Sequence, residues 1–249
     1  MAKVIASVTN DLITDQRVHK VCSGLKKAGF DVVLVGRKLN GSPLPELREY
    51  QVNLLKFAIN KGPLFYASYN IRLFFFLLFN KADILIANDL DTLPANYLAS
   101  KIKGCKIIYD THEYFCHVPE LSNRPLVKAV WQAIEGFIFP KLKYVMTVND
   151  TLAALYSEKY KVKVHVLKNI PRSNTKELQN KVKTKEEPGL PAGKKIIIYQ
   201  GAVNVDRGLE EAILAMHYLD DAVLLIIGGG DVLQKLKDLL EKLQPQKVH

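Results

Sequence analysis

The chain has 249 residues, of which 48% are hydrophobic and 24% charged, a composition typical of a soluble globular protein of one or two domains. Its formal net charge of +10 favours anionic partners, although the lack of arginine-rich runs and aromatic–glycine signatures argues against nucleic acid. The three cysteines have neither metal-site spacing nor the even number of a disulfide framework, so we expect reduced thiols and no bound metal.

The first two-thirds of the chain alternates short β-branched runs with amphipathic segments, a pattern typical of βαβ units on a parallel sheet. The predicted strands are residues 3–8, 30–35, 51–59, 82–87, 105–109, 144–148 and 162–167. The predicted helices are residues 15–27, 63–79, 92–103, 125–139 and 149–160. We expect Thr14 to cap the first helix, residues 40–45 to form a loop, and the strongly apolar helix 63–79 to be sandwiched in the core.

Beyond this region the composition changes. Residues 171–192 are polar, lysine-rich and contain prolines, which indicates a linker between a domain at 1–170 and a second domain at 193–249. The predicted elements of the second domain are a strand at 194–200, a helix at 209–219, a strand at 222–227 and the lead-in to a further strand at 244–249. A complete α/β domain needs on the order of 100–150 residues, so we expect the second domain to be incomplete.

Polar side chains follow several predicted strands, at the sheet edge where parallel sheets bind their ligands. They are Asn10 and Asp11 after the first strand, Asp89 and Asp91 after the fourth, and Asp110, His112 and Glu113 after the fifth. For the residues after the first and fourth strands, a ligand contact and a simple turn or helix cap are equally open. Arg17 lies in the first turn of a predicted helix, where a cation opposes the macrodipole, so we expect an anion or carboxylate beside it.

His112 is the candidate catalytic residue, because it lies in the loop directly after a well-marked strand. A single histidine is also often purely structural, and this alternative stays open. The neighbouring carboxylates of Asp110 and Glu113 are expected to orient its ring.

Two glycine turns mark the second domain. The first, bounded by Gly201 and Gly208, would let a phosphate approach the backbone, and Arg207 could form a charge-assisted contact with a diphosphate. The alternative is a solvated arginine beside an ordinary turn. The second turn, residues 228–230, does not complete the G-x-G-x-x-G pattern because Leu233 stands at its last position, which argues against a dinucleotide oxidoreductase.

The segments that carry a resemblance to a known family are residues 15–20 (DQRVHK), 29, 32–36, 109–113 (YDTHE), 199–201, 207–208 and 225–230. The first four resemble the N-terminal domain of the family-four glycosyltransferases, and the last three resemble the start of that family's donor-binding domain. The resemblance implies an α/β, GT-B-like fold with a complete N-terminal Rossmann-like domain, a parallel sheet, and an incomplete second Rossmann-like domain across a cleft. It also implies sugar transfer from a nucleotide-diphospho-sugar, usually with retention and without a metal or other cofactor.

The resemblance also implies roles for individual residues. Gly201, Arg207 and Gly208 would bind the donor, with Arg207 neutralising the leaving diphosphate. His112 would lie near the transferred sugar. The implied acceptor-side residues are Asn10, Asp11, Arg17, Asp89, Asp91 and Glu113.

Three departures from the family pattern leave other functions open. Residues 9–11 replace a glycine-rich loop, Ala202 replaces an arginine, and a pair of glutamates expected later in the donor domain is not reached before His249. The alternatives are a truncated chain without turnover, a non-catalytic module that binds a membrane or partner through its basic surface and the apolar segment 71–79, and a nucleotide-sugar epimerase of the same architecture.

The expected location is the cytoplasm or the inner face of its membrane, where the basic charge would suit anionic lipid. The N-terminal apolar stretch is too short for a signal peptide, and the run 71–79 contains Arg72 and is too short to span a bilayer. The expected partners are a nucleotide sugar, a glycan or lipid-linked acceptor and an anionic membrane surface.

Overall fold

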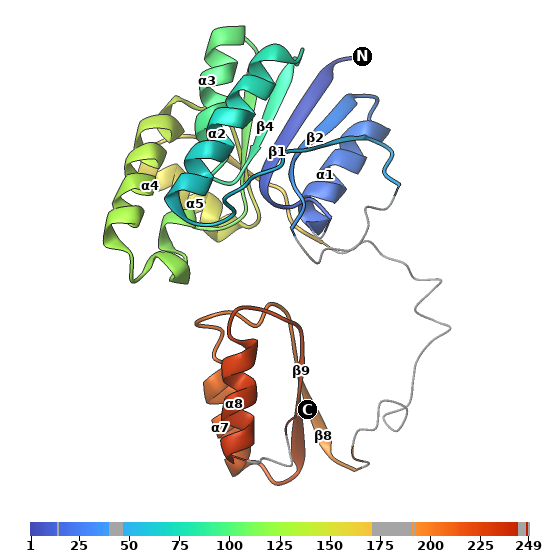
Figure 1. Ribbon diagram of the computed structural model, residues 1–249, viewed down its shortest axis with the longest axis vertical. Helices are drawn as coiled ribbons and strands as arrows, with labels where there is room; N and C mark the ends of the chain where they lie inside the picture. The colour runs from blue at the N-terminus through green and yellow to red at the C-terminus, as the bar shows by residue number, and fades with distance from the viewer. Residues whose placement is uncertain (14, 40–46, 171–190, 192, 244–247, 249) are drawn as a thin grey trace. The chain divides into compact units, whose positions relative to one another are not determined.

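The computed structural model describes all residues except 14, 40–46, 171–190, 192, 244–247 and 249 (Figure 1). It divides into two compact units, Met1–Ile170 and Pro171–His249, which we call the N-terminal and C-terminal units. Thr14, the expected loop 40–45 and nearly all of the expected linker 171–192 lie outside the described residues.

The N-terminal unit is built on a seven-stranded parallel sheet with the order β3-β2-β1-β4-β5-β6-β7. Its strands are β1 (Lys3–Asp11), β2 (Asp31–Arg37), β3 (Gln51–Leu54), β4 (Ile84–Asn88), β5 (Lys106–Thr111), β6 (Tyr144–Thr147) and β7 (Val164–Val166). Its helices are α1 (Gln16–Lys27), α2 (Gly62–Phe79), α3 (Leu93–Lys103), α4 (Pro125–Ile138) and α5 (Asp150–Tyr160), with short 3-10 turns at Phe115–His117, Pro119–Leu121 and Phe139–Lys141. The strand order reverses between β1 and β4, which makes their carboxyl ends the topological switch point.

Alternation along the strands divides the core between the two faces of this sheet. Val4 and Ala6 of β1 pack with the buried residues of α1, whereas Ile5 packs against α2 and α3. Tyr109 of β5 faces the same side as Ile5 and packs with α4 and α5. Helix α1 therefore covers one face, and α2 to α5 cover the other (Figure 1).

The ends of the first elements differ from the prediction. β1 continues to Asp11, so Asn10 and Asp11 belong to the strand and do not form a loop after it. Its pairing with β2 shifts register between Ser7 and Asp11, which explains why the pattern of alternation is lost there. The N-cap of α1 is Asp15, which accepts a hydrogen bond from the Val18 N–H at 3.0 Å, so the predicted cap at Thr14 is wrong.

β3 ends at Leu54 and not at residue 59. Carbonyl groups beyond its end bond to side chains and not to a neighbouring strand, since Arg72 donates to the Lys56 oxygen and Arg37 donates to the Asn60 oxygen. These arginine contacts hold an irregular segment in place of the predicted continuation.

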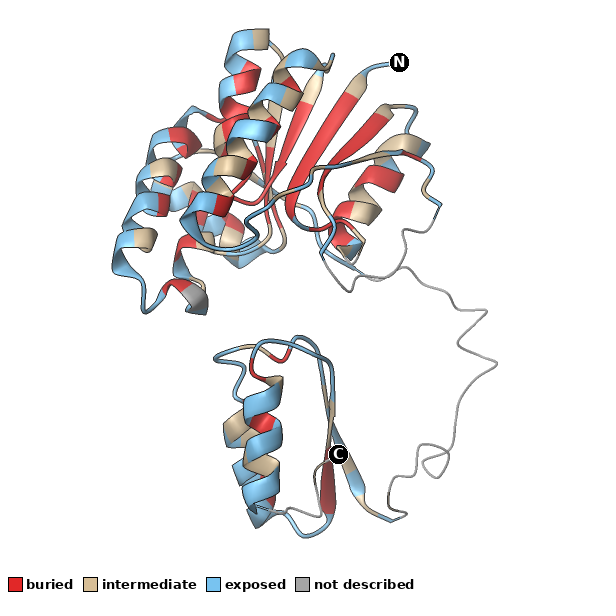
Figure 2. Cartoon of the chain, in the orientation of Figure 1, coloured by how far each residue is buried: buried red, intermediate tan, exposed pale blue. Residues whose placement is uncertain are grey.

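Helix α2 is not sandwiched, contrary to the prediction. One row of its side chains, Phe65, Tyr69, Leu73 and Leu77, is buried against the sheet and α3. The opposite side is exposed although it is also apolar (Figure 2). The sequence shows that the helix is apolar all round, a property that normally marks burial on every side.

The C-terminal unit contains a parallel pair of strands, β8 (Lys195–Gln200) and β9 (Ala222–Ile227). The predicted helix 209–219 is present as α7 (Leu209–Ala215) followed by the 3-10 turn Met216–Tyr218. A further helix, α8 (Leu233–Leu243), covers the same small core. In the segment predicted as the lead-in to a further strand, Val248 forms a parallel bridge with Leu224 of β9.

We predict that Gly36→Ala lowers the free energy of unfolding by about 1–3 kcal/mol through overpacking. A Cβ at this position of β2 would lie 2.6 Å from the Val8 oxygen and 2.7 Å from Leu12 Cδ2. Urea unfolding followed by the fluorescence of Trp131, the single tryptophan, reports on the N-terminal unit. Gly24→Ala is the control, because a Cβ there meets no atom within 4 Å and should be neutral or stabilising. Equal midpoints for Gly36→Ala and the parent protein would contradict this packing.

Candidate active site

The carboxyl edge of the sheet, at the switch point, gathers polar side chains that are unusually buried. Thr9, Asp89, Asp91 and Asp110 come from β1, β4 with the loop after it, and β5, and each is buried. The sequence placed most of these residues after strand ends. In the structure Thr9 donates to Asp91, and the carboxylates of Asp89 and Asp110 both lie against His112. Their contacts decide which of them can act on a ligand.

Arg17 and Asp110 form a buried ion pair at the centre of this edge. Arg17 Nη2 donates to Asp110 Oδ1 at 2.6 Å, and Nη1 donates to the Leu167 carbonyl oxygen at 2.8 Å. The expected carboxylate beside Arg17 is therefore Asp110, which lies on β5 and is fully buried. The guanidinium ties α1 to β5 and to the segment after β7.

His112 lies between two carboxylates. Its Nδ1 is 3.1 Å from Asp89 Oδ2, and its Nε2 is 3.5 Å from Asp110 Oδ2. The His112 backbone N–H also donates to Asp89 Oδ1 at 2.9 Å, so that one carboxylate holds both the ring and the main chain. The carboxylates seen to hold the ring are Asp110 and Asp89, whereas Asp110 and Glu113 were expected.

The two carboxylates fix the charge of His112. Burial lowers the pKa of the imidazole, but the hydrogen bonds and negative charges of Asp110 and Asp89 outweigh it and raise the pKa to about 10. Burial acts to raise the pKa of Asp110, and the contacts with His112 and Arg17 outweigh it and lower that pKa. At neutral pH the ring is an imidazolium that keeps its proton.

Asp89 has a structural reason to hold this position. It adopts a left-handed backbone conformation with φ of 60°, which aspartate tolerates better than most residues. Its N–H donates to the Asp110 carbonyl oxygen at 3.0 Å. The N-cap of α3 is Thr92, so the alternative in which Asp89 or Asp91 caps this helix does not hold.

Asp91 is a buried carboxyl next to Asp89. Burial and the neighbouring charge of Asp89 raise the pKa of Asp91 to about 7, although the hydrogen bond from Thr9 Oγ1 and the charge of Arg37 act in the opposite direction. Its Oδ1 has no hydrogen-bond partner within the described part of the chain. Near neutral pH this carboxyl exchanges a proton and offers an unused oxygen.

Arg37 is a member of this edge that sequence reasoning missed. Its Nε donates to the Thr9 carbonyl oxygen at 2.7 Å, its Nη1 donates to the Asn60 carbonyl oxygen at 3.0 Å, and its guanidinium lies 4.1 Å from the centroid of the Phe65 ring. The available signal was its place at the carboxyl end of the strand next to β1, because β2 extends two residues beyond its predicted end at Val35.

The remaining acceptor-side candidates lie at the margin. Asn10 is exposed at the end of β1, and Glu113 is exposed beyond β5. Asp11 is buried and its Oδ1 accepts a hydrogen bond from the Ile13 N–H at 3.1 Å, the contact expected of a turn-forming aspartate.

The donor-side candidates lie in the C-terminal unit. Gly208 has φ of 70° and is the N-cap of α7, a conformation that favours glycine. The two glycine turns are packed together, because a Cβ at Gly228 would lie 1.9 Å from the Gly201 oxygen. Arg207 is exposed, and in the described ranges of the chain it has neither a hydrogen bond nor an ion pair. Glu210, in the first turn of α7, pairs with Lys235 at 3.0 Å.

The cysteines do not form a metal or nucleophile site. Burial and the neighbouring Glu135 raise the pKa of the Cys116 thiol above its usual range, and its Sγ donates to Glu135 Oε2 at 2.7 Å. Cys22 is buried and, like Cys105, is not part of a disulfide. Among the residues that the structure describes, His, Cys, Asp and Glu form no cluster suited to a metal ion.

Comparison with known proteins adds a family and a set of similar folds. The profile of Glycosyltransferase Family 4 matches residues 15–170. No curated protein sequence matches the chain.

Three solved structures illustrate the likeness in fold. Sucrose-phosphate synthase from Thermosynechococcus elongatus has a TM-score of 0.76 at 14% identity, Anabaena HepE in complex with UDP and glucose has 0.67 at 13%, and the catalytic domain of starch synthase IV from Arabidopsis thaliana, bound to ADP and acarbose, has 0.65 at 13%. Each match covers 100% of this chain, and 70%, 68% and 73% of the other chain, respectively. The chain is thus partial relative to these proteins.

We predict that Asp89→Asn lowers the pKa of His112, because one of the two carboxylates that favour the imidazolium is lost. In the parent protein, an NMR titration should find His112 still protonated at pH 8. Asp31→Asn is the control: this half-exposed carboxylate is paired with Lys3 at 3.8 Å, and its loss should leave the His112 titration unchanged.

The same pKa sets a pH dependence of stability. The folded-state pKa of about 10 lies above the ordinary value of 6.5, so the stabilisation is fully present below pH 6.5 and is lost as the pH rises through 10. If His112 of the parent protein titrated near pH 6.5, its ring would not lie between the carboxylates of Asp89 and Asp110.

Proposed function

The chain belongs to glycosyltransferase family 4, and from that premise we propose that it transfers a sugar from a nucleotide-diphospho-sugar to a glycan or lipid-linked acceptor, with retention of configuration. We place this reaction in the cytoplasm or at the inner face of its membrane. The fold that supports the proposal is α/β and GT-B-like, with a seven-stranded parallel sheet and a second, smaller parallel sheet.

The observation that carries the proposal is the hydrogen-bonding character of the carboxyl edge of the N-terminal unit. Arg17 and His112 balance the charges of Asp89 and Asp110, so these four groups together are close to neutral. Buried oxygens that lack a partner within the described residues are Asn88 Oδ1 and Asp91 Oδ1. Unpaired acceptors in a neutral setting suit the hydroxyl donors of a sugar better than they suit a phosphate.

His112 is proposed to contact the transferred sugar, as the resemblance to the family implies. Because its pKa is about 10, it cannot act as a general base at neutral pH. Its proposed contribution is a fixed, preorganised positive charge near the transferred sugar, because both ring nitrogens already face carboxylates. Asp89 is a positioning residue, since it acts through the His112 ring and backbone.

The C-terminal unit offers an exposed positive charge, whereas the carboxyl edge of the N-terminal unit is close to neutral. Arg207 is exposed beside a glycine turn and can form a charge-assisted contact with a diphosphate. Gly201 and Gly208 are proposed to let the donor approach the backbone. The similar structures that hold UDP and ADP support a nucleoside diphosphate as the leaving group.

The proposed reaction follows from these groups. The bond between the anomeric carbon of the sugar and the donor diphosphate breaks, and the diphosphate leaves with its bonding electrons. The acceptor hydroxyl then forms the new bond to the same carbon, and its proton passes to an oxygen of the departing diphosphate. Arg207 stabilises the departing diphosphate, which is the largest charge that develops in the reaction.

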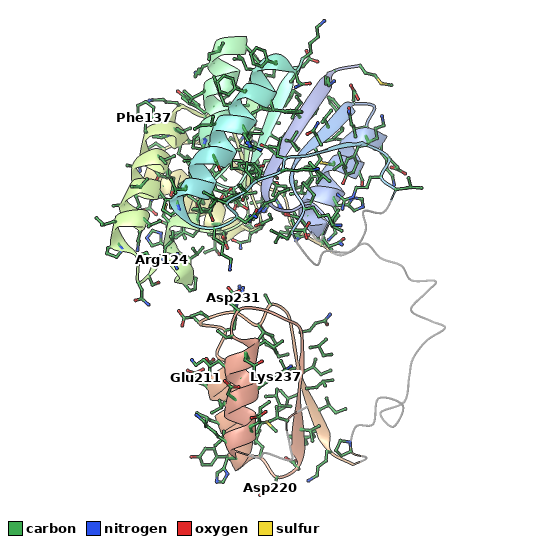
Figure 3. The ribbon with its side chains drawn as sticks, viewed as in Figure 1. Arg124, Phe137, Glu211, Asp220, Asp231 and Lys237 are labelled. Atoms are coloured by element: carbon green, nitrogen blue, oxygen red, sulfur yellow. The ribbon has the colours of Figure 1, made fainter. Side chains whose placement is uncertain are left out.

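We predict that Arg207→Ala weakens the binding of UDP or ADP about 10-fold to 150-fold, the effect of losing one charge-assisted hydrogen bond. Isothermal titration calorimetry of the chain measures this affinity. Lys237→Ala is the control, because Lys237 is an exposed cation on α8 of the same unit (Figure 3). Equal affinities of the parent and the Arg207 variant would remove Arg207 from the donor site.

The reaction itself can be followed without knowledge of the acceptor. With UDP-glucose as the probe, we expect slow release of glucose and UDP, detected by mass spectrometry, and a reduction of about 100-fold or more in His112→Gln because the charge is lost. UDP affinity should be unchanged in this variant, since the residue lies in the other unit. An epimerised nucleotide sugar as the product would favour the epimerase alternative, and no turnover with intact UDP binding would favour a non-catalytic module.

A further inference from the structure

Helix α2 exposes a long apolar side that the core does not use. Its buried residues repeat every four positions, as expected for one face of a helix. On the outward side, Ile71 is 59% exposed, Phe75 50% and Phe79 79%. The helix is long and apolar enough to cross a membrane by length and composition, yet only 22% of it is buried.

Helix α3 extends this outward side. The Ala95 N–H donates to Asn70 Oδ1 at 3.1 Å near one end, and Lys103 Nζ donates to the Leu77 carbonyl oxygen at 2.7 Å near the other, so the two helices run parallel. Leu98 and Ile102 are the exposed apolar residues of α3. We define the α2–α3 face as Leu64, Ile71, Phe75, Phe79, Leu98 and Ile102.

The charges carried by helices α2 and α3 themselves have a single sign. Neither helix contains an aspartate or glutamate. The basic residues within or directly flanking the two helices are Lys61, Arg72, Lys81, Lys101 and Lys103. Arg72 turns back to donate to the Lys56 carbonyl oxygen and lies 5.3 Å from the Phe57 ring centroid, so its charge does not interrupt the apolar row. The result is an apolar surface with a basic margin.

We propose that the α2–α3 face docks on an anionic lipid bilayer, with the apolar side chains in the interface and the lysines at the level of the headgroups. Such an arrangement of apolar centre and basic margin is typical of helices that lie in the membrane plane. The row of Phe65, Tyr69, Leu73 and Leu77 remains in the core, so α2 does not span the bilayer. The proposal deepens the membrane location given under the proposed function by naming its surface.

Charge also decides against a second copy of the chain. A symmetric contact through this face would bring the same basic margins together, and like charges at close range oppose association. Anionic lipid carries the opposite charge, so its interaction with the basic margin is attractive, and each basic residue near the surface adds to the attraction. The outward side of α2 also offers few polar groups that could give the directional contacts of a specific protein interface.

The test is flotation of the full chain with vesicles of phosphatidylcholine alone and of phosphatidylcholine with phosphatidylglycerol. We expect binding to the mixed vesicles that falls as salt rises, and little binding to the neutral ones. Phe75→Ser with Phe79→Ser should reduce the partition coefficient at least about 10-fold, since two large apolar contacts are lost. Circular dichroism and Trp131 fluorescence verify that the variant is folded.

The matched control is Leu126→Ser with Phe137→Ser, two residues on α4 that are 83% and 63% exposed. Phe137 is labelled in Figure 3. This variant should bind vesicles like the parent. Equal losses in both variants, equal binding to neutral vesicles, or no binding at low salt would each overturn the proposal. So would concentration-dependent dimerisation in analytical ultracentrifugation that is abolished by the α2 substitutions. Because vesicle binding needs no sugar transfer, its failure leaves the catalytic proposal standing.

Discussion

The buried pair of Arg17 and Asp110 is the interaction on which the carboxyl edge depends. Asp110 is fully buried, and a carboxylate in that position is costly unless a cation and further hydrogen bonds compensate it. Arg17 of α1 supplies one compensating positive charge, and His112, in the loop after β5, supplies a second. The same guanidinium bonds the carbonyl group of Leu167, so the compensation of one charge also joins three parts of the fold.

The parallel sheet and its helices were predictable because hydrophobic periodicity and β-branched runs can be read from residues that are close together in the sequence. The places where prediction was wrong are those where tertiary contacts decide. β1 continues through polar residues to Asp11 because it pairs beside Arg37, and β3 ends early because arginine side chains take the carbonyl groups beyond it. Helix α2 is apolar all round, and only the packed structure shows that a single row of it faces the core. Its outward side carries the proposed membrane contact.

The candidate site was predictable as a location and less so as a set of contacts. The strand-end rule placed Asp89, Asp110 and His112 on one edge, and Arg17 was expected to need a carboxylate. Which carboxylates hold the His112 ring could not be read from spacing, since Asp89 lies 23 positions away and depends on an unusual left-handed backbone. The role of Arg37 was not predicted, because its position at the end of a strand does not show that its side chain bonds to the Thr9 carbonyl oxygen of the neighbouring strand.

The interlocked glycine turns of the C-terminal unit have a consequence for how its ligand preference can change. A Cβ at Gly230 would lie 2.3 Å from the Val203 oxygen, and a Cβ at Gly228 would lie 1.9 Å from the Gly201 oxygen, so the second turn cannot accept a side chain at either position without displacing the first. The backbones of the two turns are in contact, so a change in the shape of one requires a change in the other. Variation in this part of the protein is therefore confined to positions such as Arg207, whose exposed side chain can be exchanged while the backbone beneath it keeps its shape.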